Sequence, residues 1–392
     1  MSLLLHGARL FDDGAITDDA WILVADGRIA ELGVGTSWQQ LPPVVSGQAE
    51  VLDATAAAGA GALLTPGFID LHGHGGGGAA YDDGAEAIRA ARALHRAHGT
   101  TRAVISLVTA PIEQLAGRLE LVAELCVSDP DVLGSHLEGP FLAQSQRGAH
   151  DSELLCAPTS AALDRLLAAG NGTVRQVTIA PELPGGLDAV RQVVAAGSVA
   201  AVGHTGADLA QAAAAFDAGA SILTHTFNAM SGLHHRWPGP VGAALSDERV
   251  TLEVIADGVH LHPAVVRMLC AAAPGRIALV TDAMAAAGAP DGSYLLGALA
   301  VTVVDGVARL SRTDGDGLGA IAGSTLTQDQ ALRTAVAAGV PLPAAIDALT
   351  RAPADAIARP DLGRLARGSI ADIVLLDSEL AVRRVWVAGQ EV

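Results

Sequence analysis

Short apolar, β-branched runs alternate with Ala- and Leu-rich segments of helical period through the middle of the chain. This alternation is typical of repeated βα units on a parallel sheet. Eight such runs end in the sequences LLTPGFIDLHGHG, TTRAVISLVTA, DVLGSHLEGP, VRQVTIAPE, VAAVGHTGA, ASILTHTFNAM, VTLEVIADGVH and RIALVTDAM. Residues 86–99 and 207–219 predict two intervening helices, which end at Gly99 and Gly219. The pattern predicts an α/β fold, a (β/α)8 TIM-type barrel over residues 66–362.

The two ends of the chain have a different pattern. Short alternating runs such as AWILVADGRIAELG and GSIADIVLLDSELAVRRVWVAGQEV are separated by Gly and Asp turns. They predict a small discontinuous β-sandwich domain from residues 1–65 and 363–392, in which the C-terminal strands complete the N-terminal sheet. A further strand-like pair between Gly292 and Arg312 predicts a hairpin inserted after the eighth barrel strand.

Composition and charge narrow the choice of partner and compartment. Only five Phe, four Trp and two Tyr are present, so Ala, Val, Leu and Ile must form most of the core. A formal net charge of −18 opposes nucleic-acid binding. The first residues turn polar before a long apolar segment forms, and no later apolar run reaches spanning length. We therefore expect a cytoplasmic protein without a membrane partner.

The sequence contains no lysine, because all of its basic side chains are arginines. This absence excludes Schiff-base catalysis, a P-loop lysine and a carboxylated lysine that bridges two metal ions. Cys126, Cys156 and Cys270 are widely spaced and form no CxxC pair, so we expect packed thiols in place of zinc ligands.

Polar residues stand where the predicted barrel strands end. In a (β/α)8 barrel the loops after the strands meet at one mouth, where chemistry takes place. The side chains in this register, from the first strand to the eighth, are His72, His74, Glu138, Glu182, His204, His225, His260 and Asp282. Their common position predicts a shared site.

The residue types at this mouth favour a metal site. His72 and His74 alternate along an extended segment, so both rings face the same side. The other strand ends add imidazoles and carboxylates, and Glu138 is the evident bridge between two ions. The set predicts one or two divalent ions per subunit, with zinc favoured and iron or another first-row ion as alternatives. A single ion on Glu138 and the imidazoles of the fifth and sixth strands, with His72 and His74 weakly occupied, stays open.

The remaining histidines are expected to be structural. His95 and His98 fall in the last turn of a helix, where a charged ring favours the helix dipole. His136 shares a strand face with Glu138, and it either orients that carboxylate or packs in the core. The others with no expected catalytic role are His6, in a terminal strand, and His262, before Pro263 at a helix start.

The motifs around these residues resemble the amidohydrolase superfamily and, within it, the N-acetylglucosamine-6-phosphate deacetylases. PGFIDLHGHG, HLEGPFL, GHT, THTFNAM, ADGVH, LVTDAM and LGRLARGSIADIVLLD are similar to that family's signatures, in order and over essentially the whole chain. HLEGP, THTFNAM and ADGVH are the most specific of them. The resemblance implies metal-dependent hydrolysis of N-acetyl-D-glucosamine 6-phosphate to D-glucosamine 6-phosphate and acetate, in amino-sugar catabolism.

The resemblance also implies roles for individual residues. Glu138, His204 and His225 would bind the principal metal ion, Asp282 would be the catalytic acid and base, and the histidine pair favours two ions. Contacts to the substrate are implied for His150, Asn228, Ala229, Arg236 and His260. Arg236 would reach the substrate phosphate in a neighbouring subunit, which implies a homodimer, although Trp237 replaces a commonly acidic residue.

Two other functions stay open. A D-aminoacylase or isoaspartyl-dipeptidase-like amidohydrolase would place an α-carboxylate where a phosphate is expected, beside Arg236. A non-catalytic amidohydrolase-like scaffold would lack ligand residues, and every ligand position is filled here. The metal content of the purified protein would separate the scaffold from the enzymes.

Overall fold

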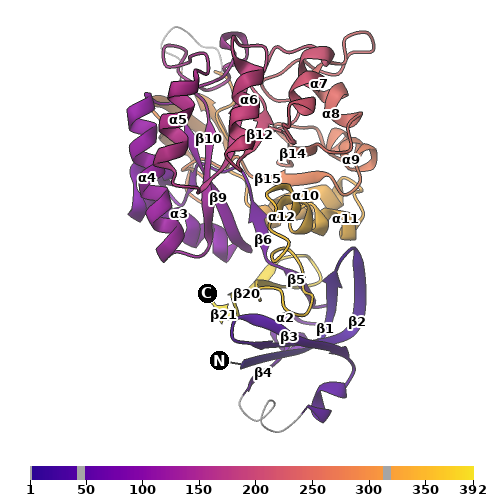
Figure 1. Ribbon diagram of the computed structural model, residues 1–392. Helices are drawn as coiled ribbons and strands as arrows, with labels where there is room; N and C mark the ends of the chain where they lie inside the picture. The colour runs from indigo at the N-terminus through magenta and orange to yellow at the C-terminus, as the bar shows by residue number, and fades with distance from the viewer. Residues whose placement is uncertain (1, 42–48, 312–318) are drawn as a thin grey trace.

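A computed structural model describes residues 2–41, 49–311 and 319–392, and its larger part is a barrel of parallel strands (Figure 1). Each barrel strand pairs in parallel with the next one along the chain. In order they are β6 (Phe68–Asp70), β9 (Thr100–Val108), β10 (Val132–Glu138), β11 (Val174–Ile179), β12 (Val199–Val202), β13 (Ile222–Leu223), β14 (Thr251–Ile255) and β15 (Ile277–Val280). The predicted (β/α)8 architecture is confirmed.

Helices cover the outside of this sheet (Figure 1). They are α3 (Ala85–Ala97), α4 (Ile112–Ser128), α5 (Ser160–Ala169), α6 (Gly186–Ala195), α7 (Leu209–Asp217), α8 (Gly239–Leu245), α9 (Pro263–Ala272), α10 (Gln328–Ala337), α11 (Leu342–Asp347) and α12 (Arg351–Ala356). In α7, Asp208 and Gln211 form a reciprocal capping box at the N-terminus. Gly99 and Gly219 have φ of 89° and 111° just after α3 and α7, as the predicted helix ends require.

Side chains close the barrel between its first and last strands. β6 and β15 are the two ends of the described sheet. The buried Gln328 amide donates to Ile69 O at 3.2 Å on β6 and to Leu279 O at 3.1 Å on β15. Thr281 Oγ1 donates to Asp70 at 2.6 Å nearby. The Gln328 amide thus donates to backbone carbonyls of β6 and β15 that have no partner in the described sheet.

The strands of both chain ends form one further sheet, which lies below the barrel in Figure 1. It contains β1 (Ser2–Asp12), β2 (Ala15–Ala25), β3 (Arg28–Val34), β4 (Ala49–Asp53), β5 (Leu63–Pro66), β19 (Ile373–Leu376), β20 (Val382–Val387) and β21 (Gln390–Glu391), with α2 (Ala54–Ala58) beside them. Leu3 and Leu5 face one apolar cluster and Leu4 faces another, because strand side chains alternate. The division at residues 65/66 and 362/363 stays a prediction.

Three antiparallel strands stand in place of the predicted hairpin: β16 (Gly292–Leu296), β17 (Leu299–Val304) and β18 (Val307–Leu310). The two-strand prediction was wrong because Gly297 and Gly306, at φ of 57° and 72°, make two turns. Arg312, its predicted end, lies outside the described residues. Val301 and Val303 pack against Met284, just after β15, so this insertion covers part of the barrel mouth. No described helix is both long and apolar enough to cross a bilayer.

Candidate active site

The side chains at the strand ends converge on two groups that share one carboxylate, that of Glu138. Within each group the potential ligand atoms all lie within 4.8 Å of one another, and every member is buried. The first group is His72, His74, Glu138 and Asp282, and the second is Glu138, His204 and His225. All six ligand residues predicted from the sequence are therefore brought together.

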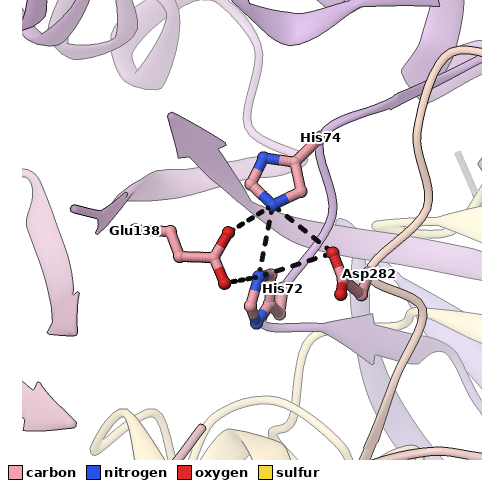
Figure 2. A group of neighbouring side chains, drawn as sticks. All are labelled: His72, His74, Glu138 and Asp282. Carbon is pink, nitrogen blue, oxygen red and sulfur yellow. Dashed lines mark hydrogen bonds and ion pairs between the residues drawn. The ribbon is translucent and has the colours of Figure 1, made fainter. Parts of the chain in front are cut away.

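In the first group, two carboxylates face a pair of imidazoles from opposite sides (Figure 2). Glu138 Oε2 lies 2.9 Å from His74 Nε2, and Glu138 Oε1 lies 3.3 Å from His72 Nε2. Asp282 Oδ1 lies 3.4 Å from His74 Nε2 and 3.7 Å from His72 Nε2. Four potential ligand atoms thus surround one point.

The second group uses the same Glu138 carboxylate. Oε1 lies 3.1 Å from His204 Nε2 and 3.0 Å from His225 Nε2. The two Nε2 atoms are 2.9 Å apart. Glu138 therefore lies between the groups, as a bridging ligand would.

The ring nitrogens that point away from this carboxylate test whether the donors fit a metal. His204 Nδ1 lies 2.9 Å from Gln146 O, and His72 Nδ1 lies 3.1 Å from Glu253. A carbonyl and a carboxylate can only accept, so these contacts place a proton on Nδ1, and in the neutral ring the Nε2 lone pair then points toward Glu138. Neutral imidazoles combined with carboxylates suit a divalent metal ion.

The electrostatics of the group centre on a buried negative charge. Burial raises the pKa of Glu138, but the His72 ring and the contacts to His150, His204 and His225 outweigh it and hold that pKa well below its usual value. Burial lowers the pKa of His72, but Glu138 and Asp282 outweigh it and hold that pKa well above the usual value. The ionised carboxylate requires a nearby positive charge, so protons and a cation compete for this site.

Three of the predicted ligands have a backbone conformation that residues other than glycine rarely adopt. The φ angles of His204, His225 and Asp282 are 46°, 25° and 47°. For residues other than glycine this left-handed conformation costs free energy, and residues that adopt it cluster at functional sites. Backbone bonds hold them, including Asp282 N to His72 O at 2.7 Å. The chain therefore turns sharply at the strand ends to aim these side chains inward.

A cavity of about 300 Å³ opens onto both groups. Its walls include the predicted substrate residues His150, Asn228, Ala229 and His260, together with Leu296 of the insertion. Arg236 is exposed and is not among the residues that line this cavity. The contact predicted for it, to the substrate phosphate of a neighbouring subunit, stays a prediction.

The pKa values of two histidines of the cavity are shifted in opposite directions. Burial lowers the pKa of His150 to about 4, and its Nδ1 contacts Thr109 Oγ1 at 2.8 Å. Burial also lowers the pKa of His260, but the bond to Asp257 Oδ2 at 2.7 Å outweighs it and raises that pKa above its usual value. His150 is thus a neutral ring at pH 7.

Four residues outside the ligand groups can be compared with their predictions, and the structure corrects those for His95 and Cys156. His95 was expected to favour the helix dipole as a charged ring, but it is buried and burial lowers its pKa to about 4. His136 bonds to Ser106 at 2.9 Å and Thr178 at 2.8 Å, so its packing role holds. Cys156 is exposed, contrary to the expectation of packed thiols. Glu182 belongs to neither ligand group and accepts from Thr205 and from the Gly206 N–H.

Two buried carboxylates beside the ligands were missed. Glu253 on β14 accepts from His72, and Asp70 on β6 accepts from the His72 N–H at 3.2 Å. Each is a charged residue inside an apolar strand run, VTLEVI and GFID. That placement was the available signal, because a buried charge requires partners.

Comparisons with known proteins agree with this geometry. Residues 63–392 match the amidohydrolase family. An N-acetylgalactosamine-6-phosphate deacetylase of Escherichia coli O157:H7 is 39% identical over 100% of this chain and 99% of its own. A solved N-acetyl-D-glucosamine-6-phosphate deacetylase of Mycobacterium smegmatis is 43% identical over all of both chains, with a TM-score of 0.90. An N-acetylglucosamine-6-phosphate deacetylase of Vibrio furnissii is 35% identical over 83% of this chain and 82% of its own. The chain therefore belongs to the amidohydrolase family, as its motifs predicted.

Proposed function

We propose that the protein hydrolyses the acetamide of N-acetyl-D-glucosamine 6-phosphate, and that it releases D-glucosamine 6-phosphate and acetate. The observation that carries the proposal is the buried pair of ligand groups at the floor of the cavity, with Asp282 beside both rings of the first group. The similarity to the Mycobacterium smegmatis enzyme over all of both chains supports the substrate. The reaction would belong to amino-sugar catabolism in the cytoplasm.

The proposed cofactor is zinc, with two ions per subunit. Glu138, His204 and His225 would hold the principal ion, and the first group would hold the second one. Ions in such sites lower the pKa of a water ligand and polarise an amide carbonyl. The donor set of imidazoles and carboxylates supports this choice.

Asp282 would move the proton that the reaction needs. Its carboxylate lines the cavity and would accept the proton of the attacking water. It would then return the proton to the sugar nitrogen, because an unprotonated amine anion is a very poor leaving group. The neutral His150 ring, also on the wall, would donate to the carbonyl oxygen as negative charge develops there.

The sugar phosphate would be held by Asn228, Ala229 and His260, and by Arg236 of a second subunit. Asp257 binds His260 Nδ1, which leaves Nε2 for the substrate. No guanidinium is among the cavity-lining side chains of the described chain, so a homodimer would supply the missing charge. Trp237 and Leu233 are 69% and 46% exposed beside Arg236, and exposed apolar side chains of this kind favour a protein contact.

A second candidate substrate is N-acetylgalactosamine 6-phosphate, which differs in the configuration at C4. It is favoured by the 39% identity to the Escherichia coli O157:H7 enzyme over the full length of this chain.

Acetate release tests the proposal directly. Zinc-loaded and metal-stripped protein would be given both hexosamine phosphates and unphosphorylated N-acetylglucosamine. We expect release only with metal, and fastest from N-acetylglucosamine 6-phosphate. Faster release from the galacto compound would establish the second candidate, and no release from any of them by metal-loaded protein would refute both.

The Arg236 role has its own test. Arg236→Ala should raise KM for the phosphorylated substrate by roughly 10- to 100-fold, the value of a hydrogen bond to a charged group. Arg249→Ala is the matched control, because Arg249 is exposed and pairs with Asp247 and Asp217 away from the cavity. Equal KM values for the two variants, or a monomer at assay concentration, would contradict the shared site.

A further inference from the structure

A buried glutamate that is not a member of either ligand group contacts both of them. Glu253 lies on β14 and its side chain has no exposed surface. Its Oε1 accepts from Gln176 Nε2 at 2.8 Å. Its Oε2 lies 3.1 Å from His72 Nδ1 and accepts from the His225 backbone N–H at 3.3 Å. Both oxygens of this buried charge are therefore satisfied by donors.

The contact to His72 determines which of its nitrogens can bind a cation. A carboxylate only accepts, so a proton lies on His72 Nδ1, and in the neutral, metal-binding form of the ring the Nε2 lone pair points at the first group. In the second group, Gln146 O does the same for His204. The Nδ1 atoms of His74 and His225 have no partner in the described chain. Each ligand group thus contains one imidazole whose orientation is set by an acceptor.

The second contact of Oε2 reaches the other group through the backbone. His225 has a φ of 25°, a conformation that other contacts must hold in place. The Glu253 carboxylate receives the N–H of this residue. One oxygen atom therefore contacts a ring of the first group and the main chain of a ligand in the second.

We propose that Glu253 is a positioning residue that orients the His72 ring for the first ligand group. The ion held by the first group depends on it, while Glu138, His204 and His225 keep their own ion without it. This inference rests on the proposed two-ion site. Loss of an acceptor behind a metal-bound histidine typically weakens metal affinity 10- to 100-fold.

Three variants separate positioning from general stability. Glu253→Leu removes the acceptor with little change of volume, and one ion per subunit should bind roughly 10- to 100-fold more weakly. Glu253→Gln should keep both ions, because its carbonyl can still accept from His72. Its amide would face Gln176 Nε2, and a 180° turn of the Gln176 amide would present the unpartnered Gln176 Oε1 as its acceptor. Thr178→Val is the matched control, since Thr178 is equally buried in the barrel and the hydrogen bonds of its hydroxyl go to His136 and Thr224, not to a ligand residue.

The measurement is zinc per subunit by mass spectrometry across a zinc titration, with circular dichroism to confirm folding. The expected result is two ions in wild type, Glu253→Gln and Thr178→Val, and one retained ion in Glu253→Leu. Wild-type affinity for both ions in Glu253→Leu, or equal loss in Thr178→Val, would overturn the inference. If Glu253→Leu does not fold, Glu253→Asp carries the test, because it keeps the charge but withdraws the oxygens from His72. In that variant, unweakened binding of both ions would overturn the inference. A single ion in wild type would refute the two-ion proposal itself, and the inference with it.

Discussion

A buried histidine behind the first-strand loop should make the fold sensitive to acid. His95 is 1% exposed on α3, and its Nε2 donates to Gly75 O at 2.9 Å in the loop that follows His74. Its Nδ1 is buried and has no partner in the described chain. Burial lowers the pKa of His95 to about 4, because a second proton on Nδ1 would place an unpaired charge in the core.

The size and sign of the effect follow from this pKa. An unfolded histidine has a pKa of about 6.5, so the unfolded chain binds the proton first as the pH falls. The contribution of neutral His95 is complete above pH 6.5 and is lost as the pH falls toward 4. At about 1.4 kcal/mol for each pH unit between the two values, the loss is about 3 kcal/mol in total, of which about 2 kcal/mol appears by pH 5.

Urea unfolding of metal-free protein at pH 7, 5 and 4 measures this loss. The perturbation is His95→Gln, whose amide can still donate to Gly75 O but does not titrate. Between pH 7 and pH 5 the variant should lose about 2 kcal/mol less stability than wild type, and the exposed His235→Gln control should follow wild type. Parallel pH curves for wild type and His95→Gln would refute the reasoning.

Three further substitutions have defined outcomes. Asp282→Asn should lower kcat by about 10²-fold or more with unchanged metal content at the second group, and a near-normal rate would contradict its acid–base role. Gln328→Leu leaves the carbonyls of Ile69 and Leu279 without their donor and should lower the free energy of unfolding in urea by about 2–4 kcal/mol. A decrease below about 1 kcal/mol would mean that other donors satisfy these carbonyls between β6 and β15. Asp208→Ala removes the N-terminal cap of α7 and should lower the free energy of unfolding by about 1 kcal/mol. Thermal unfolding should show a lower Tm, and an unchanged Tm would contradict the contribution of the cap.

Much of the fold could be predicted because local patterns determine it. The βα rhythm and the glycines after α3 and α7 are visible in the sequence, and the barrel follows from them. The closure of the barrel could not be predicted in this way. Gln328 lies 259 residues from Ile69 and 49 from Leu279, so no periodic pattern connects them. Likewise, a second glycine turn gave the insertion a third strand.

The ligand residues could be predicted because a strand end fixes where a side chain lies, whatever surrounds it. The residues behind them could not, because their roles depend on what else is buried. Glu253 is 181 residues from His72, and only the folded barrel brings the two together. The same limit applies to His95, whose position on α3 suggested a charged ring while its burial keeps it neutral.

Glu138 explains why the two ligand groups behave as one site. The chain has no lysine that could be carboxylated, so the Glu138 carboxylate is the evident side chain to bridge two ions. Oε1 faces the imidazoles of three ligand histidines and Oε2 faces those of His74 and His150, which makes this side chain common to both groups. A substitution at Glu138 therefore affects both groups, whereas one at His74 affects the first alone. The asymmetry proposed for Glu253 has the same origin, since it acts on a ring of the first group while the second retains its own acceptor at Gln146.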